Sequence, residues 1–255
     1  MSVVPPRLYK YESFTEQSLR NLKNRSIYLS SPDKFNDPYD CALHPVIPPP
    51  NITDAVRMRN LYIDRLQNEE QVKIVRDKED SDLPDFFAGA IKMSMDNLRD
   101  KFSKQGISCF SEVNYEMLMW SHYAGKHTGF CLEFNSQYAP FNLAKAVCYK
   151  EQMPLIDASK LLIDKNYEEV LDLFSTKSTS WQYEQEWRIR SSRKINECII
   201  YQPEALTGIY FGPRTSRDIM EIVYLITHKT SIECKFWEGR ISRTAFKVEF
   251  DAFKP

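Results

Sequence analysis

The chain has 255 residues, of which 42% are hydrophobic and 27% charged, and its formal net charge is −1. This composition is ordinary for a globular protein and excludes wholesale disorder. A net charge close to zero also gives no overall electrostatic attraction for nucleic acid. The length allows one large domain or two small ones, and we expect a single domain over residues 1–255.

The start of the chain and its cysteines predict a cytoplasmic protein. Residues 1–11 lack the charged and apolar regions of a signal peptide, and no apolar run approaches the roughly 20 residues that span a bilayer. Six cysteines stand singly, without a CxxC pair, which predicts reduced, buried thiols rather than zinc ligands or disulfides. We therefore expect no contact with a membrane.

The first fifty residues predict a strand, a helix and a second strand, followed by an irregular segment. Residues 7–11 are rich in aromatics that favour strands, residues 13–24 fit a short helix, and residues 25–31 again favour a strand. The segment FNDPYD (35–40) consists of residues typical of tight turns. Three prolines at 48–50 predict an extended spacer.

A helical insert is expected over about 52–103. Its apolar residues recur at helical spacing among many charges, and the sequence KEDSDLPD (78–85) predicts a break between two helices. The insert carries no catalytic motif. We interpret it as a cap or as a surface that binds a partner protein.

The remaining sequence predicts a mixed sheet with helices packed around it. Strands are expected at 107–111, 129–134, 146–150, 186–190, 208–212, 232–237 and 244–250. Helices are expected around 115–124, 156–174 and 215–226.

The segment WQYEQEWRIR (181–190) carries the most chemistry. In a strand, alternation gives two opposite faces: Glu184, Glu186, Arg188 and Arg190 against Tyr183, Gln185, Trp187 and Ile189. Two carboxylates at i and i+2 perturb each other's pKa, which suits general-base or charge-stabilising work. The alternative is a surface helix in which Glu184 and Arg188 form an ion pair.

A second segment, MWSHYAGKHTG (119–129), concentrates Trp120, His122, Tyr123 and His127. A histidine near aromatic and serine side chains can bind a polar ligand edge, shuttle a proton or coordinate a metal. The five-residue spacing between the two histidines does not place them on one helix face as HExxH does, so we expect no metal. A purely structural histidine is the alternative.

The third segment, FNDPYD, offers Asn36, Asp37 and Asp40 to ribose hydroxyls, an amide or a cation. The alternative is that these side chains only bond their own backbone in turns. GxGxxG, GxxxxGK[ST], GxSxG and HExxH are absent from the sequence, and with only 7 Gly a backbone cradle for phosphate is not expected.

The succession LYKY, IYLSSPDKFNDPYDC, ISCFSE, MWSHYAGKHTGFCLEF, VCYKE and WQYEQEWR resembles a widespread bacterial and phage family classed as a domain of unknown function. The resemblance runs from about residue 8 to 212, apart from the insert. The order of a strand with a polar side chain, a Ser-bearing strand and a late Glu-x-Glu strand is also similar to the ADP-ribosyltransferase fold. We therefore expect an α+β fold with a mixed, largely antiparallel (split) β-sheet, packed helices and the insert.

In ADP-ribosyltransferases a split sheet grips NAD, and a late glutamate stabilises the oxocarbenium-like transition state. The resemblance implies that Tyr9, Lys10 or Tyr11 takes the early-strand role and that Ser111 is the middle serine. Glu184 and Glu186 match the Glu-x-Glu pair, with Glu186 as the main catalytic carboxylate. The early strand lacks the usual His or Arg, and CFSE lacks the usual Ser-Thr-Ser.

The resulting hypothesis is an ADP-ribosyltransferase-like toxin or phage-defence effector. It takes NAD as substrate, needs no metal, and transfers ADP-ribose to a protein or nucleic acid. The hypothesis predicts that Glu186→Gln abolishes activity and leaves the fold intact. The expected substrate-binding residues are Tyr9, Lys10, Tyr11, Asn36, Asp37, Asp40, Ser111, Trp120, His122, Tyr123 and Arg188.

Two other functions stay open. A metal-dependent phosphodiesterase or nuclease would use Asp37, Asp40, His122 and one carboxylate of the 184–186 pair. A non-enzymatic binding or regulatory module of a defence or toxin system would use the insert as its interface. Both enzyme hypotheses require the three segments to meet in space.

Overall fold

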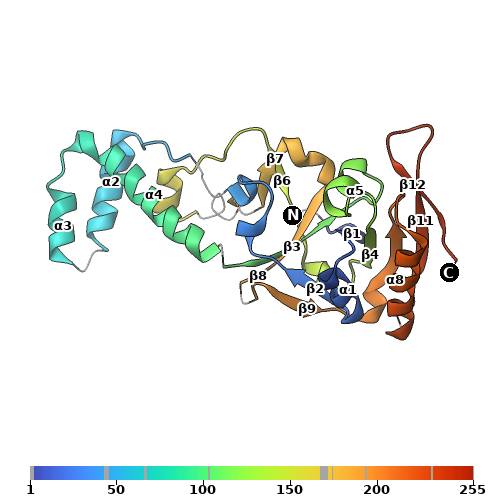
Figure 1. The fold of residues 1–255 in the computed structure, drawn as a ribbon. Helices are drawn as coiled ribbons and strands as arrows, with labels where there is room; N and C mark the ends of the chain where they lie inside the picture. The colour runs from blue at the N-terminus through green and yellow to red at the C-terminus, as the bar shows by residue number, and fades with distance from the viewer. Residues whose placement is uncertain are drawn as a thin grey trace. The chain divides into compact units, whose positions relative to one another are not determined.

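The computed structural model describes residues 3–42, 46–65, 68–102, 104–166, 172–173, 175–192, 194–230 and 232–254. Backbone contacts divide the chain into two compact units (Figure 1). The first comprises residues 1–34, 104–147 and 180–255, and the second comprises residues 35–103 and 148–179. The helical insert expected at 52–103 falls within the second unit.

The first unit is built on one eight-stranded sheet. Its strands are β1 (Arg7–Glu12), β3 (Gly106–Ser111), β4 (Phe130–Asn135), β5 (Lys145–Ala146), β8 (Glu186–Ser191), β10 (Leu206–Phe211), β11 (Lys235–Ile241) and β12 (Val248–Ala252). The order is β12-β11-β10-β4-β1-β3-β8-β5, and only β10 and β11 run parallel. This sheet confirms the expected α+β fold with a mixed, largely antiparallel sheet. Strands β2 (Ser26–Leu29) and β9 (Glu197–Ile200) form a separate antiparallel pair.

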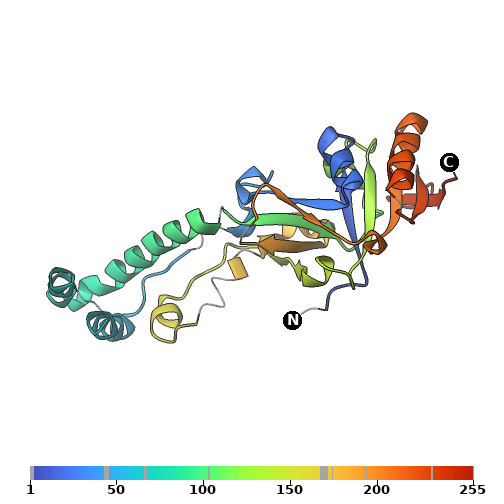
Figure 2. The ribbon, with the colours of Figure 1, turned by 90° about the horizontal axis from the view of Figure 1, so that it is seen from below.

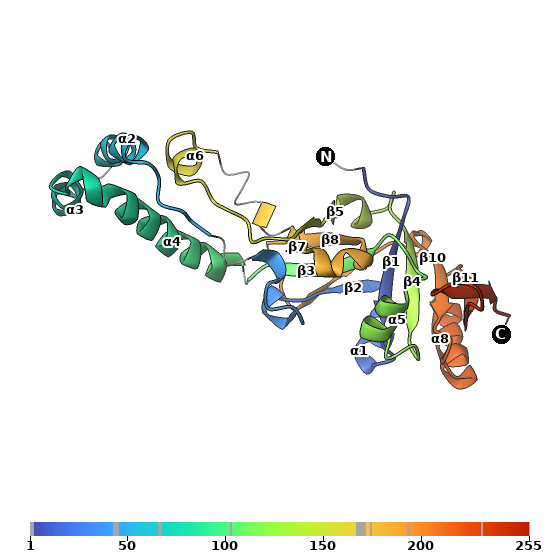
Figure 3. The same ribbon diagram turned by 90° about the horizontal axis from the view of Figure 1, so that it is seen from above.

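The sheet is narrowest between β1 and β3, which pair only at Tyr9 and Ser111. By comparison, β1 pairs with β4 over the six residues from Arg7 to Glu12. Figure 3 shows β1 and β4 running steeply across the direction of β3 and β8. The sheet therefore consists of two diverging halves that the Tyr9–Ser111 pair joins, which is the form that the expected split takes.

Helices cover both faces of this sheet. Helices α1 (Glu16–Lys23) and α8 (Arg217–Lys229) pack against each other on one side of the sheet (Figure 2). Leu22 of α1 and Val223 of α8 belong to the main core. The side chain of Thr15 starts α1, because it accepts a hydrogen bond from the Ser18 amide in a capping box. Helix α5 (Met117–Tyr123) belongs to a second cluster on the opposite face, through Trp120.

The second unit contains three helices of the insert, α2 (Ile52–Ile63), α3 (Glu69–Arg76) and α4 (Leu83–Phe102), and the short helix α6 (Ala158–Leu162). Strands β6 (Cys148–Lys150) and β7 (Thr176–Ser178) pair in parallel. The predicted break at 78–85 is confirmed, since α4 begins at Leu83. The break before α3 was not predicted; there the Asn68 side chain accepts from the amides of Glu70 and Gln71 and caps a new helix.

Several predicted elements were wrong in extent. The strands expected at 232–237 and 244–250 begin later, as β11 at Lys235 and β12 at Val248. The strand expected at 146–150 is divided between β5 and β6, which belong to different sheets. The helix expected at 156–174 ends at Leu162, and Lys165 adopts a left-handed φ of 55°, which a continuing helix does not allow. Residues 167–171 and 174 of that prediction lie outside the described residues.

All six cysteines are free thiols, as expected, but their burial differs. Cys41 and Cys131 are buried, whereas Cys148 on the short strand β6 is exposed, so the prediction of buried thiols was wrong for Cys148. Within the described ranges, none of the helices combines the length and the apolar character needed to cross a bilayer.

Candidate functional site

The Glu-x-Glu segment enters β8 from a short 3-10 helix, η5 (Thr179–Glu184). Because β8 begins at Glu186, the predicted alternation holds only from that residue onward: Trp187 and Ile189 join the main core, and Glu186 and Arg188 project to the other face. The predicted strand was wrong for residues 183–185. The alternative of a surface Glu184–Arg188 pair was wrong too, because Arg188 is 1% exposed in a strand.

Gln185 turns the chain between the two carboxylates. It has a left-handed φ of 44°, its amide donates to the Gln182 carbonyl at 3.2 Å, and its carbonyl accepts from the Glu112 amide at 3.0 Å. As a result Glu184 and Glu186 are 2% and 5% exposed, whereas Gln185 faces solvent. A strained residue thus separates two carboxylates that are both buried.

We expect Gln185→Gly to raise the free energy of unfolding by up to about 1 kcal/mol, since glycine removes the Cβ that penalises a left-handed backbone. Gln185→Val should lower it by about 1–2 kcal/mol, because a β-branched residue tolerates this conformation least. Urea unfolding followed by tryptophan fluorescence measures both. Equal stability of the two variants would show that the turn is unstrained.

Glu186 forms a buried, two-pronged ion pair with Arg188. The guanidinium donates from Nε to Oε1 at 2.7 Å and from Nη2 to Oε2 at 3.0 Å. The two side chains are 4% and 1% exposed. Such fork-to-fork pairing fixes the carboxylate in one orientation. Glu186 is therefore a preorganised negative charge rather than a mobile surface acid.

Glu184 and Ser111 are linked to each other. The Tyr123 hydroxyl donates to the Glu184 carboxylate at 2.7 Å, and the Ser111 hydroxyl donates to the Glu184 carbonyl at 2.6 Å. The Ser111 oxygen also accepts from the Val113 amide at 3.1 Å. Since Ser111 is fully buried, its contribution is to hold η5 against β3.

The register of the sheet brings three predicted residues into one row. Tyr9 pairs with Ser111 across β1 and β3, and Ser111 pairs with Glu186 across β3 and β8. Paired residues of antiparallel strands project to the same face. With strands about 4.8 Å apart, the backbones of Tyr9 and Glu186 lie about 10 Å from each other. We call these three residues the row.

The other early-strand and aromatic candidates have structural roles. Lys10 projects to the opposite face, where its Nζ lies 3.3 Å from the Cys109 carbonyl and over the Phe110 ring. Tyr11 donates to the Val113 carbonyl at 2.9 Å and meets Trp120 edge-to-face with 5.2 Å between ring centroids. Trp120 is fully buried. We therefore leave Lys10, Tyr11 and Trp120 out of the candidate site.

His122 is exposed and lies among rings from both motif segments. Its ring centroid is 6.1 Å from that of Tyr123, 6.2 Å from that of Trp181 and 6.4 Å from that of Tyr183. Because Tyr123 contacts the Glu184 carboxylate, this aromatic cluster adjoins the buried acids. Partly buried rings next to a carboxylate suit a flat, polar ligand.

The GKHTG loop joins α5 to β4 with a tight backbone. Gly125, Lys126 and His127 all have left-handed φ angles, 57°, 56° and 74°. The His127 ring is only partly buried; its burial, followed by the charge of Arg214, lowers the pKa of the imidazole from its usual value. In the described part of the chain, no group of three or more His, Cys, Asp and Glu side chains is arranged to hold a metal ion.

The FNDPYD residues belong to the second unit. Asp37 accepts from the Tyr39 amide at 2.9 Å, which is the local turn bond given as the alternative to ligand binding, and Asn36 is exposed. Asp40 accepts from the Cys41 amide at 2.6 Å and pairs with Lys177 at 3.5 Å. That ion pair is buried, so Asp40 anchors the segment to β7.

Sequence reasoning missed Glu133, in the middle of β4. It is 2% exposed and accepts from the hydroxyls of Tyr9 at 3.2 Å, Tyr210 at 2.7 Å and Thr207 at 2.7 Å, and it pairs with Arg7. Burial, and next Glu133, raise the pKa of Tyr9 and Tyr210 above the usual tyrosine range. One signal in the sequence could have identified it: Glu133 is a single acid inside the apolar strand GFCLEF. A charge buried in such a strand needs hydrogen-bond or ionic partners.

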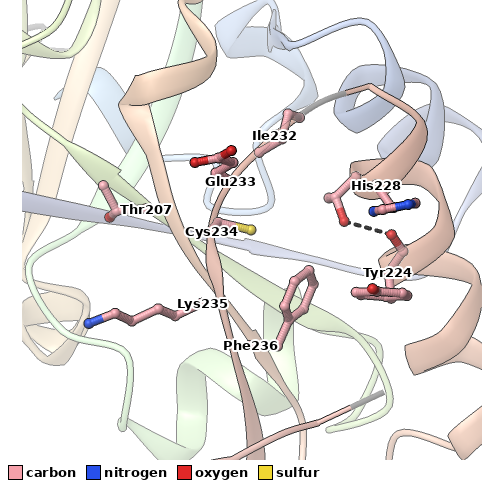
Figure 4. A pocket seen from close by; sticks show the side chains of 9 residues that line it. Thr207, Tyr224, His228, Ile232, Glu233, Cys234, Lys235 and Phe236 are labelled. Carbon is pink, nitrogen blue, oxygen red and sulfur yellow. Dashed lines mark hydrogen bonds between the residues drawn. The ribbon is translucent and has the colours of Figure 1, made fainter.

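A hollow of about 480 Å³ lies between α8 and β11 in the first unit (Figure 4). No residue of the row or of the His122 cluster lines it. Its lining is Thr207, Tyr224, Thr227, His228, Ile232, Glu233, Cys234, Lys235 and Phe236. Burial raises the pKa of the Cys234 thiol to about 12, so this thiol is not a nucleophile at neutral pH.

Comparison with known proteins bears on the segment that carries the acids. No curated protein and no solved structure matches the chain. Residues 119–189 match the model of a family described as a protein of unknown function (DUF2971), from within α5 to within β8. The predicted resemblance to a family of unknown function is confirmed over residues 119–189, the range that the DUF2971 model matches.

Proposed function

We propose that the first unit cleaves NAD at the nicotinamide–ribose bond and transfers ADP-ribose to a macromolecule. The observation that supports this most is the row of Tyr9, Ser111 and Glu186. These residues take the early-strand, middle-serine and late-glutamate roles that the resemblance to ADP-ribosyltransferases implies. They lie side by side where the two halves of the sheet diverge.

The chemistry of the proposed step follows from the fixed charge of Glu186. When the bond between C1′ and the nicotinamide nitrogen breaks, nicotinamide leaves with the electron pair and positive charge spreads over C1′ and the ring oxygen. A carboxylate held by Arg188 needs no reorientation to stabilise that charge. The acceptor's oxygen or nitrogen then bonds to C1′ and loses a proton, for which Glu184 is the neighbouring base.

The test is nicotinamide release from NAD by the wild type, Glu186→Gln and Glu204→Gln. Glu204 is exposed on a short 3-10 helix of the same unit and serves as a matched control. We expect the wild type and the control to release nicotinamide equally, in the presence of EDTA as well. Glu186→Gln should be at least about 100-fold slower, the usual loss on removing one preorganised electrostatic group.

Folding of the variants must be checked by circular dichroism. Glu186→Asp keeps a charge beside Arg188 and shortens its reach by one methylene, so it gives a second variant if Glu186→Gln does not fold. Absence of NAD turnover, together with absence of thermal stabilisation by NAD, would remove the proposal. Turnover unchanged in both Glu186 variants would remove it equally.

A binding function of the second unit is the other candidate, because its helices expose apolar side chains. Ile52, Ile74 and Met93 are 54%, 53% and 71% exposed on α2, α3 and α4. Exposed apolar residues on neighbouring helices favour a protein partner. A partner bound without NAD, and lost on replacing Ile74 and Met93 with lysine, would support this function.

A further inference from the structure

The hydroxyl of Tyr9 is committed as a hydrogen-bond donor. It has one hydrogen, and this hydrogen points at Oε2 of Glu133, 3.2 Å away. Burial and the neighbouring carboxylate raise the pKa of Tyr9 above its usual range, so the hydroxyl keeps its hydrogen at neutral pH. What Tyr9 can offer a ligand is therefore the lone pairs of its oxygen.

The other contacts of Glu133 do not free the Tyr9 hydrogen, because each of these partners also donates to the carboxylate. Thr207 donates to Oε1 and Arg7 pairs with the same oxygen, while Tyr210 shares Oε2 with Tyr9. Four donors converge on a side chain that is 3% exposed. A carboxylate so bound only accepts, and it keeps the Tyr9 hydrogen directed at itself.

Of the four residues that donate to Glu133, Tyr9 is the one that also belongs to the row. It is only partly buried, whereas Tyr210 is 8% exposed and stacks on Trp237 with 5.9 Å between ring centroids. The backbones of Tyr9 and Glu186 lie about 10 Å apart, and both residues project to the same face of the sheet. A ligand whose ribose lies at Glu186 thus places its base near Tyr9.

We propose that Tyr9 accepts a hydrogen bond from the carboxamide of nicotinamide, and that Glu133, as a positioning residue, makes the site reject the corresponding carboxylate. The inference rests on the proposed NAD cleavage. A carboxamide brings N–H donors to the Tyr9 oxygen, whereas the carboxylate of nicotinic acid brings only acceptors. The substrate class is therefore amide-bearing pyridine dinucleotides.

The experiment compares NAD with its deamido analogue, nicotinic acid adenine dinucleotide, as substrates of the full chain. We expect kcat/KM of the wild type to be at least about tenfold lower for the analogue, the usual effect of one unpaired polar group in a site. In Glu133→Gln the side-chain amide can donate to Tyr9 and free its hydrogen. The preference for NAD should then fall to within about threefold.

Two tyrosine variants keep the test decisive if Glu133→Gln does not fold. Tyr9→Phe should lose activity with NAD and not with the analogue. Tyr210→Phe removes a donor to the same Glu133 oxygen and should keep the wild-type ratio of kcat/KM for the two dinucleotides. Equal use of both dinucleotides by the wild type overturns the inference and leaves NAD cleavage standing. A ratio unchanged in Tyr9→Phe overturns it as well. Turnover of neither dinucleotide means that the proposed function itself has failed.

Discussion

Glu186→Gln is expected to lower the free energy of unfolding of the first unit by about 3–5 kcal/mol, because the substitution leaves a buried guanidinium without its carboxylate. Arg188 is 1% exposed and donates to both oxygens of Glu186. A glutamine offers one acceptor oxygen and no charge. All four tryptophans, Trp120, Trp181, Trp187 and Trp237, lie in the first unit, so urea unfolding followed by tryptophan fluorescence measures its stability.

The matched control is the exposed ion pair of Glu16 and Arg20 on α1, whose side chains are 84% and 58% exposed. Glu16→Gln should change the stability by less than about 0.5 kcal/mol, since solvent screens such pairs. Adding Arg188→Met to Glu186→Gln should restore most of the loss, because removing both buried charges removes the unpaired one. A double variant as unstable as the single one would show that the ion pair is not the cause.

This expectation changes how a loss of activity in Glu186→Gln is interpreted. From the sequence, the substitution was expected to leave the fold intact, since only a charge is lost. The contact with Arg188 makes that charge part of the packing as well as of the proposed chemistry. Activity and stability must therefore be measured in the same variants, and Glu186→Asp separates the two.

The strands of the first unit could be predicted because their patterns are local. Period-2 alternation and aromatic content placed β1, β3, β4 and β8 close to their observed bounds. The pairing of Tyr9 with Ser111 could not be predicted, because register depends on contacts between strands that are about 100 residues apart in the sequence. The resemblance supplied the three roles, and only the structure supplied their adjacency.

The errors have physical causes of the same kind. Nothing in the sequence indicates that Gln185 adopts a left-handed backbone. That one residue nevertheless places Glu184 outside the predicted strand. Glu133 is a single acid in an apolar run, and its four partners come from β1 and the β10 region. A buried polar group is identified by its partners in three dimensions, and the periodicity of the sequence does not indicate those partners.

Gly129→Ala is expected to lower the free energy of unfolding of the first unit by about 3 kcal/mol, because a Cβ at this position overpacks the backbone. It would lie 2.9 Å from the Ala124 carbonyl oxygen and closer still to that of Glu12. The backbone of Gly129 cannot move away freely. Its amide donates to Ala124 at 2.8 Å, and its carbonyl accepts from the Gly212 amide at 2.9 Å and from the Thr215 hydroxyl at 2.8 Å.

Gly89→Ala is the matched substitution without a clash, since no atom lies within 4 Å of its added Cβ on the exposed side of α4. It should stabilise the second unit by about 0.5–1 kcal/mol through helix propensity, measured by circular dichroism. If Gly129→Ala were equally harmless, the close approach of the GKHTG loop to β1 would not exist in solution. If it destabilises as expected, this loop fixes the start of β4 against β1, and with it the alignment of Glu133 beside Tyr9 on which the proposed substrate preference depends.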